Sequence, residues 1–179
     1  MINTIAYIDR FTTSFINQVI PHTPFLDTIF RFLSFQGSAI IIWIIIFCIF
    51  FIYEERKEKK FIVYFATIII ISAVLTNYVF KTAFHRQRPL PPLKTITLTC
   101  PKDFSFPSGH SAIAFASAYT LSRFDKKRRY VYYLIASLIA ISRIYLYCHY
   151  FLDTLGGALL GSSVAWLFMK IHLQNKKKD

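Results

Sequence analysis

The amino-acid sequence predicts an all-α integral membrane protein, in which a bundle of about five transmembrane helices follows one or two amphipathic interfacial helices. Hydrophobic residues make up 55% of the 179 positions, whereas charged residues make up only 17%. The apolar residues form five long runs, and a soluble domain of this length has too little polar surface to cover all five. Many of the basic residues lie between those runs, as in the loops of membrane proteins. The length fits a single domain over residues 1–179.

Residues 1–36 are expected to form helices that lie in the membrane interface. Over residues 1–20, apolar side chains recur at helical spacing and polar side chains fall elsewhere, which is typical of a helix lying on a membrane. Pro21 and Pro24 end this helix, and residues 25–35 are expected to form a second short helix. Arg31 argues against a full crossing of the membrane in that second segment.

The five predicted spans lie in the apolar runs at residues 37–53, 61–80, 104–122, 130–142 and 154–169. The second run carries no charge and would extend about 30 Å as a helix, which is the thickness of a bilayer's hydrocarbon core. In the last run, Gly157 and Gly161, with Ala158 and Ser162, form a small-residue face suited to close helix packing. The transmembrane bundle is therefore expected over residues 37–171.

The formal net charge of +12 could indicate a nucleic-acid partner, but the distribution of the charge argues against one. Thirteen of the 21 Lys and Arg residues lie at residues 56–60, 123–129 and 170–178. These segments alternate with the predicted spans, so all three fall on the same side of the membrane. Because basic loops prefer the cytoplasm, the N-terminus is expected outside and the tail at residues 172–179 inside.

The three cysteines allow two interpretations. Cys48 and Cys148 lie within or close to apolar runs, where cysteine commonly serves as a small apolar side chain. A Cys100–Cys148 bridge on the outer side is the alternative, and sequence spacing does not decide between them. No cleavable signal peptide is expected, since the N-terminus lacks a basic region followed by an apolar core.

Ionisable residues gather at the outer ends of the predicted spans. Charges at membrane depth are costly, so this clustering suggests a functional site. The first cluster contains Lys81 and Arg88, directly before Pro89, and two cations at an outward-facing helix end suit an anion. The alternative is that both side chains merely extend to the interface.

The second cluster is the sequence Pro107-Ser108-Gly109-His110 at the start of the third span. Proline followed by serine is a favourable start for a helix. Gly109 allows the backbone to approach a ligand closely, and free amides at a helix N-terminus bind phosphate. The alternative is an ordinary helix cap next to an interfacial histidine.

The third cluster contains Arg143, His149 and Asp153. If His149 and Asp153 share a helix, their spacing places them on one face within hydrogen-bonding reach, where the carboxylate would orient the imidazole. Arg143 would point away on a continuous helix, so we expect a bend between Arg143 and His149, although neither glycine nor proline marks it. The alternative is a structural ion pair.

Together, the patterns Lys-x6-Arg-Pro, Pro-Ser-Gly-His and Ser-Arg-x5-His-x3-Asp resemble the three-part signature of the type 2 phosphatidic acid phosphatase superfamily. The resemblance covers residues 81–153, and no motif position departs from the pattern. The chain looks like a small bacterial member of the group that includes phosphatidylglycerophosphate phosphatase B, undecaprenyl diphosphate phosphatases and lipid A phosphatases.

The resemblance implies a phosphatase of lipid phosphates or diphosphates that forms a phosphohistidine. His149 would be the nucleophile, Asp153 would orient it, and His110 would protonate the leaving oxygen. Phosphate would be held by Lys81, Arg88, Ser108, Gly109 and Arg143. The site would face the extracytoplasmic side of a bacterial cytoplasmic membrane.

No cofactor or metal is expected. The outer carboxylates Asp9, Asp27, Asp103 and Asp153 form no close pair in sequence, whereas a magnesium site needs clustered oxygens. A scaffold or transporter that only binds an anion is the alternative function. The superfamily also includes vanadium haloperoxidases. Those enzymes are soluble, so the five apolar runs of this chain argue against a haloperoxidase function. The lipid substrate and the oligomeric state stay open.

Overall fold

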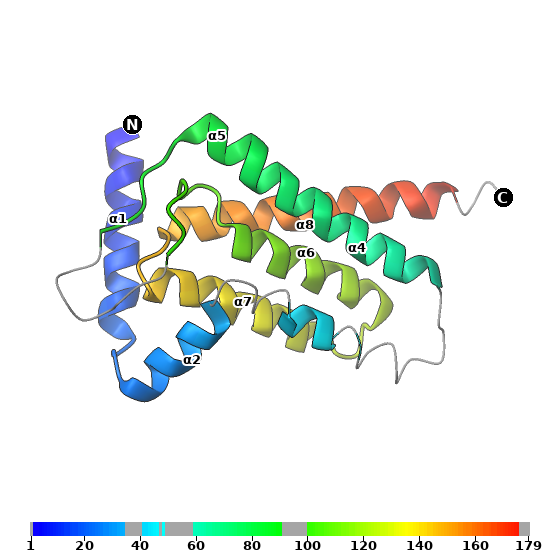
Figure 1. The fold of residues 1–179 in the computed structure, drawn as a ribbon, viewed down its shortest axis with the longest axis horizontal. Coiled ribbons are helices and arrows are strands. Elements are labelled where there is room, and N and C mark those ends of the chain that lie inside the picture. Colours follow the sequence, from blue (N-terminus) through cyan, green and yellow to red (C-terminus); the bar gives the residue numbers. More distant parts are fainter. Residues whose placement is uncertain (1, 35–40, 47, 49–58, 91–99, 176–179) are drawn as a thin grey trace.

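The computed structural model describes residues 2–34, 41–46, 48, 59–90 and 100–175, and these residues contain helices and connections but no strand. Most of the first predicted span (residues 37–53) and the end of the basic tail lie outside the described residues. The elements form one bundle of near-parallel helices, with a further helix lying across one end (Figure 1). This arrangement agrees with the predicted fold class in its all-helical character.

Two helices open the chain, α1 (Ile2–Val19) and the shorter α2 (Pro24–Ser34). The break between them includes Pro21, and α2 begins at Pro24, as expected from proline's preference for the first helical position. The side chain of Thr23 accepts a hydrogen bond from the Leu26 amide (3.3 Å) and so caps α2. Both predicted N-terminal helices are present; their position in the membrane interface stays a prediction.

Among the described residues, the bundle proper contains a long broken helix, three further helices and the short helical segment 41–46. The long helix comprises α4 (Lys59–Val74), the π-helical segment η1 (Leu75–Phe80) and α5 (Lys81–Phe84). The three further helices are α6 (Gly109–Phe124), α7 (Arg129–Tyr145) and α8 (Phe151–Asn175). Helix α6 packs against α4, α7 and α8 and is therefore the centre of the bundle (Figure 1).

Two described helical stretches, Phe61–Phe84 and Phe151–Ile171, are long and apolar enough to cross a membrane. Only 22% and 28% of the most apolar window in each stretch is buried inside the isolated chain, whereas a core helix of a soluble protein is mostly buried. Helices α6 and α7 contain 16 and 17 residues, which corresponds to about 25 Å each and is shorter than a ~30 Å hydrocarbon core. The total of about five spans stays a prediction.

The predicted small-residue face on α8 packs directly on the backbone of α6. A Cβ atom added to Gly161 would lie 1.9 Å from the carbonyl oxygen of Ala112, and one added to Gly157 would lie 2.3 Å from that of Ser108. Neither distance accommodates a side chain, so both positions require glycine. This close approach brings the beginning of α6 against the beginning of α8, where the conspicuous ionisable residues lie.

Candidate active site

The three clusters singled out in the sequence meet at one end of the bundle. Helix α5 ends there, α7 ends there, and α6 and α8 begin there (Figure 1). Two connections, residues 100–108 and 146–150, cross the same end and add further polar side chains. Helix ends meet in this way because antiparallel neighbours place alternate termini on one side of a bundle.

A sharp bend follows Arg143, as the sequence analysis expected. Helix α7 ends at Tyr145, and Tyr147 adopts a left-handed conformation (φ 55°). The carbonyl oxygen of Arg143 accepts hydrogen bonds from the amides of Cys148 (3.0 Å) and His149 (3.1 Å). The bend therefore places His149 beside Arg143. The residue type of Tyr147 does not predict a left-handed conformation.

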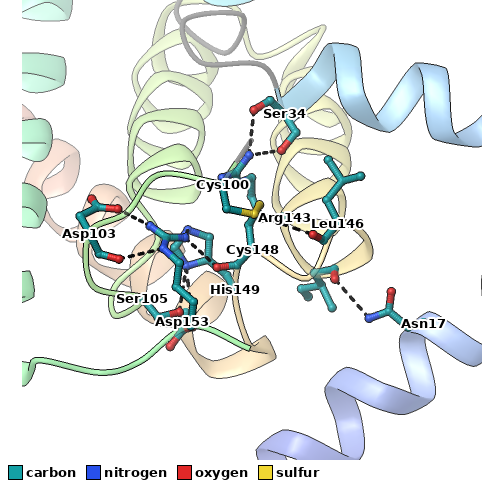
Figure 2. Close-up of a disulfide and its surroundings, with 12 residues drawn as sticks. Asn17, Ser34, Cys100, Asp103, Ser105, Arg143, Leu146, Cys148, His149 and Asp153 are labelled. Atoms are coloured by element: carbon teal, nitrogen blue, oxygen red, sulfur yellow. Dashed lines mark hydrogen bonds and ion pairs between the residues drawn. A yellow bond between two sulfur atoms is a disulfide. The ribbon is translucent and has the colours of Figure 1, made fainter. Parts of the chain in front are cut away.

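The relation between His149 and Asp153 differs from the expected one. His149 precedes α8, so the two residues do not share a helix, and His149 Nδ1 lies 3.7 Å from Asp153 Oδ2, beyond hydrogen-bonding distance. Ser105 lies between them: its hydroxyl is 3.4 Å from His149 Nδ1 and donates a hydrogen bond to Asp153 Oδ2 (Figure 2). The expected direct contact is thus replaced by a serine bridge that sequence reasoning missed.

His149 is held in the neutral form. Burial lowers the pKa of His149 well below its usual value, and the positive charges of Arg143, Arg88 and Lys81 lower that pKa further, as does nearby His110. A neutral imidazole has a free lone pair on one ring nitrogen. With Nδ1 facing Ser105 and Asp153, Nε2 is the nitrogen that faces the cations, at 3.1 Å from Arg88 Nη1.

Lys81 and Arg88 converge on the carboxylate of Asp103, which the sequence analysis had not assigned a role. The Lys81 ammonium group pairs with one carboxylate oxygen and Arg88 Nη2 with the other. Arg88 also donates to the carbonyl oxygens of Asp103 (2.9 Å) and Cys148 (2.7 Å). The two cations therefore share an anionic partner beside His149.

Asp103 is accordingly charged over a wide pH range. Burial by itself would raise the pKa of Asp103, but the hydrogen bonds and positive charges of Lys81 and Arg88 outweigh burial and lower that pKa below its usual value. Its side chain is still 44% exposed, so it lies at the mouth of the site rather than inside it.

Among the three predicted phosphate-binding cations, Lys81, Arg88 and Arg143, the most deeply buried is Arg143. The residue is only 2% exposed, and its Nη1 donates to the carbonyl oxygen (2.8 Å) and the hydroxyl of Ser34 on α2 (Figure 2). Its Nε and Nη2 have no hydrogen-bond partner among the described residues. Buried guanidinium nitrogens without acceptors are costly, which indicates a place prepared for an anion.

The Pro-Ser-Gly-His cluster forms the start of α6, as predicted. Ser108 is the N-cap, and its hydroxyl accepts from the Ser111 amide (3.4 Å). The Ser108 amide donates to the carbonyl oxygen of Asp153 (2.9 Å), which ties α6 to α8. Gly109 begins the helix, where backbone amides have no intrahelical acceptor, and His110 follows it on the first turn.

Sequence reasoning also missed Arg86, which lies inside the Lys-x6-Arg-Pro pattern at one of the six positions that the pattern leaves unspecified. Its Nη1 donates to Asp153 Oδ1 (2.7 Å), and its Nη2 pairs with Asp9 of α1. The guanidinium group also lies over the ring of Tyr150, 4.3 Å from the ring centre. Asp153 is therefore bound on one oxygen by Arg86 and on the other by Ser105.

The structure decides between the two interpretations of the cysteines. Cys100 and Cys148 form a disulfide with their Cα atoms 5.5 Å apart, so Cys148 is not simply a small apolar side chain. Cys48 is free and exposed. The bridge attaches the 100–108 connection to the bend at residues 146–150 (Figure 2).

The fold and site together define a helical bundle of membrane type in which a buried neutral histidine faces several cations at one end. The chain belongs to the PAP2 superfamily, whose family model matches residues 61–177. Among solved structures it is similar to Aquifex aeolicus LpxE, with 31% identity and a TM-score of 0.70 over 89% of this chain and 93% of that one.

A second similar structure is that of the first transmembrane PAP2 type phosphatidylglycerolphosphate phosphatase from Bacillus subtilis. The identity is 26% and the TM-score 0.66, over 96% of this chain and 88% of that one. An undecaprenyl-diphosphatase of Sulfolobus acidocaldarius is 33% identical over 108 residues, which are 59% of this chain and 52% of the relative. The chain thus spans about half the length of this curated relative.

Proposed function

We propose that the chain is a membrane phosphatase that hydrolyses lipid phosphates or diphosphates through a phosphohistidine intermediate. The observation that carries this proposal is the buried guanidinium group of Arg143, with two nitrogens lacking an acceptor among the described residues, in the same site as a neutral His149. A phosphoryl group supplies oxygen acceptors for the arginine and an electrophilic phosphorus for the imidazole. Family membership and the phosphatase names of similar proteins support the same conclusion.

In the proposed reaction, His149 Nε2 attacks phosphorus in line with the bond to the leaving oxygen. The N–P bond forms as the P–O bond breaks, and His110 donates a proton to the departing oxygen. Neutral His110 then accepts a proton from water, whose oxygen attacks the phosphohistidine and releases inorganic phosphate. Asp153, acting through its contact with Ser105 and its proximity to Nδ1, stabilises the positive charge that the imidazole acquires.

The phosphoryl oxygens would be held by three cations and a helix N-terminus. Lys81, Arg88 and Arg143 supply the positive charges, while Ser108 and the Gly109 amide supply neutral donors at the start of α6. Fixed cations of this kind stabilise the charge on the equatorial oxygens of the transferring group. We expect the arrangement to work without a divalent ion. Each described outer carboxylate has a partner within the chain, which supports this: Arg86 for Asp9 and Asp153, Lys81 and Arg88 for Asp103, and Tyr145 for Asp27.

We place the site at the extracytoplasmic face of a bacterial cytoplasmic membrane, in a chain with about five spans. The three basic segments support this orientation, since they alternate with the predicted spans and favour the cytoplasm. The Cys100–Cys148 disulfide lies at the catalytic end of the bundle, opposite the basic segments, and disulfides form and persist in oxidising compartments. A lipid headgroup at the outer interface would reach the helix ends where the site lies.

The test is a comparison of phosphate release from four lipids by the purified chain in detergent micelles. The panel comprises phosphatidylglycerophosphate, undecaprenyl diphosphate, phosphatidic acid and a lipid A phosphate, with a water-soluble sugar phosphate as the comparison. We expect turnover of several of the lipids, unchanged by a chelator of divalent ions. A strict preference for the sugar phosphate would contradict the lipid assignment, and activity lost with chelator and restored by magnesium would contradict the metal-independent mechanism.

Asp103 is expected to compete with phosphate for Lys81 and Arg88. The change Asp103→Asn removes a negative charge from the mouth of the site. We expect competitive inhibition by inorganic phosphate to strengthen about tenfold, because the Asp103 carboxylate and a bound phosphate repel each other. The inhibition constant is measured by steady-state kinetics. Because the pKa of Asp103 is lowered, wild-type inhibition should not strengthen as the pH falls from about 8 to 6 through titration of this group.

The matched control for this prediction is Asp27→Asn. Asp27 also lies at the outer end but accepts a hydrogen bond from Tyr145 instead of pairing with the site cations. The change Asp27→Asn should therefore leave the inhibition constant for phosphate unchanged. Weaker inhibition in Asp103→Asn would mean that Asp103 orients the two cations for phosphate rather than competing with it.

A further inference from the structure

Helix α1 presents its polar side to the protein and its apolar side outward. Asp9, Thr13 and Asn17, spaced four residues apart, are all buried, while Phe11 and Phe15 are exposed. The polar side chains do not simply pair with one another. Asn17 donates to the carbonyl oxygen of Ile144 at the end of α7 (3.1 Å), and the other two reach the beginning of α8.

Two amides at the start of α8 receive their hydrogen-bond acceptors from α1. The hydroxyl of Thr13 accepts from the Phe151 amide (3.0 Å), and Asp9 Oδ1 accepts from the Leu152 amide (2.8 Å). The first amides of a helix have no acceptor within the helix and need one from elsewhere. Helix α1 therefore caps α8 from a distant part of the chain, immediately before Asp153.

The same Asp9 carboxylate also binds Arg86 with its other oxygen, and Arg86 binds Asp153. The result is a chain of charges, Asp9–Arg86–Asp153, that continues through Ser105 to His149. Asp9 is 1% exposed, so its charge is removed from water and depends on this pairing. A single carboxylate on α1 thus restrains Asp153 in two ways, through the amide of the preceding residue Leu152 and through the side chain of Arg86.

From this geometry we infer that Asp9 and Arg86 are positioning residues for the proposed reaction: Asp9 holds Arg86 and the start of α8, and these hold Asp153 in place against Ser105 and His149. The inference rests on the proposed function. It assigns to α1, which lies outside the part of the chain matched by the family model, a direct part in organising the site. Neither residue touches the phosphoryl group in this scheme.

The test is a double-mutant cycle on the full-length chain in detergent micelles, with phosphate release from phosphatidylglycerophosphate as the readout. Asp9→Asn keeps the shape of the side chain but removes its charge, and Arg86→Gln removes the link to Asp153. We expect each single change to lower kcat about tenfold or more, with KM within about twofold of wild type, since a small displacement of a catalytic group slows chemistry without loosening substrate binding. In the Arg86→Gln background, Asp9→Asn should lower kcat by less than about twofold further.

The matched control is Asn17→Ala, on the same buried face of α1 but bonded to α7 rather than to α8 or Arg86. It should leave kcat within about threefold of wild type, even if it loosens α1. Equal losses of kcat in Asp9→Asn and Asn17→Ala would overturn the inference, as would independent, multiplying effects of Asp9→Asn and Arg86→Gln or a change confined to KM. Should Asp9→Asn not fold, Arg86→Gln decides alone: kcat within twofold of wild type overturns the inference. An inactive wild-type chain would instead overturn the proposed function.

Discussion

Replacing His149 with alanine is expected to lower kcat for phosphate release by at least about 10³-fold, because the proposed covalent intermediate cannot form without the imidazole. The cations and helix N-terminus remain in the variant, so substrate binding should survive. His149 is only 2% exposed, and alanine in its place leaves Asp153 still bound by Arg86 and Ser105. The loss should therefore appear in kcat and not in the yield of folded protein.

The intermediate itself provides the second readout for this variant. Brief incubation of the wild-type chain with a ³²P-labelled lipid phosphate, followed by quenching in alkali, should leave label on the protein, and His149→Ala should carry none. His22→Ala is the control, since His22 lies at the same end of the bundle but packs on Tyr145 (ring centres 4.2 Å apart) rather than in the site. Activity in His149→Ala above about one per cent of wild type would rule out His149 as the nucleophile.

The change Gly161→Ala is expected to cause the largest loss of stability of any single methyl group added to the described bundle. The new Cβ would lie 1.9 Å from the carbonyl oxygen of Ala112, a backbone atom that cannot turn aside. Helices α6 and α8 must then separate, at a cost of about 3 kcal/mol or more. A loss of that size corresponds to a midpoint of thermal unfolding lower by about 10 °C for a chain of this length, which is measurable in detergent.

Leu159→Ala provides the control for the glycine prediction. Leu159 lies on α8 two residues before Gly161, but it is 61% exposed on the outer surface of the bundle. Its truncation should lower the unfolding midpoint by less than a few degrees. An unfolding midpoint in Gly161→Ala equal to that of Leu159→Ala would show that the two helices are less tightly packed than the structure indicates.

The helix start at Ser108 and the close packing of the glycines on α8 were both predicted from the sequence. Ser108 was expected to start a helix and is the N-cap of α6, and Gly157 and Gly161 were expected to permit close packing and lie against the α6 backbone. A capping residue and a face of small residues are both recognised from a few neighbouring positions, so a single sequence is enough to predict them. The roles of His149, His110 and Lys81 were implied by the resemblance of the motifs to the phosphatase superfamily, and they remain predictions for the experiments above.

The partners of those residues could not be inferred, because they come from distant parts of the chain. Arg86 and Asp9 are 77 residues apart in sequence, and Arg86 and Asp153 are 67 apart. Ser105 and Asp103 carry no spacing relation to His149 or Lys81 that would distinguish them from other polar loop residues. The expected direct contact between His149 and Asp153 failed for a related reason, since it assumed a helix that begins only at Phe151.

The sequence by itself determined the class of protein, the helical segments and the residue types gathered at one end of the spans, because hydrophobic runs and motif spacings are properties of the chain alone. Only the tertiary structure decided how those residues are held: the Cys100–Cys148 bridge, the Ser105 contact and the Arg86 pairs. The physical reason is that burial removes water as a partner for each charge. The identity of its new partner then depends on which distant helix end folds against it.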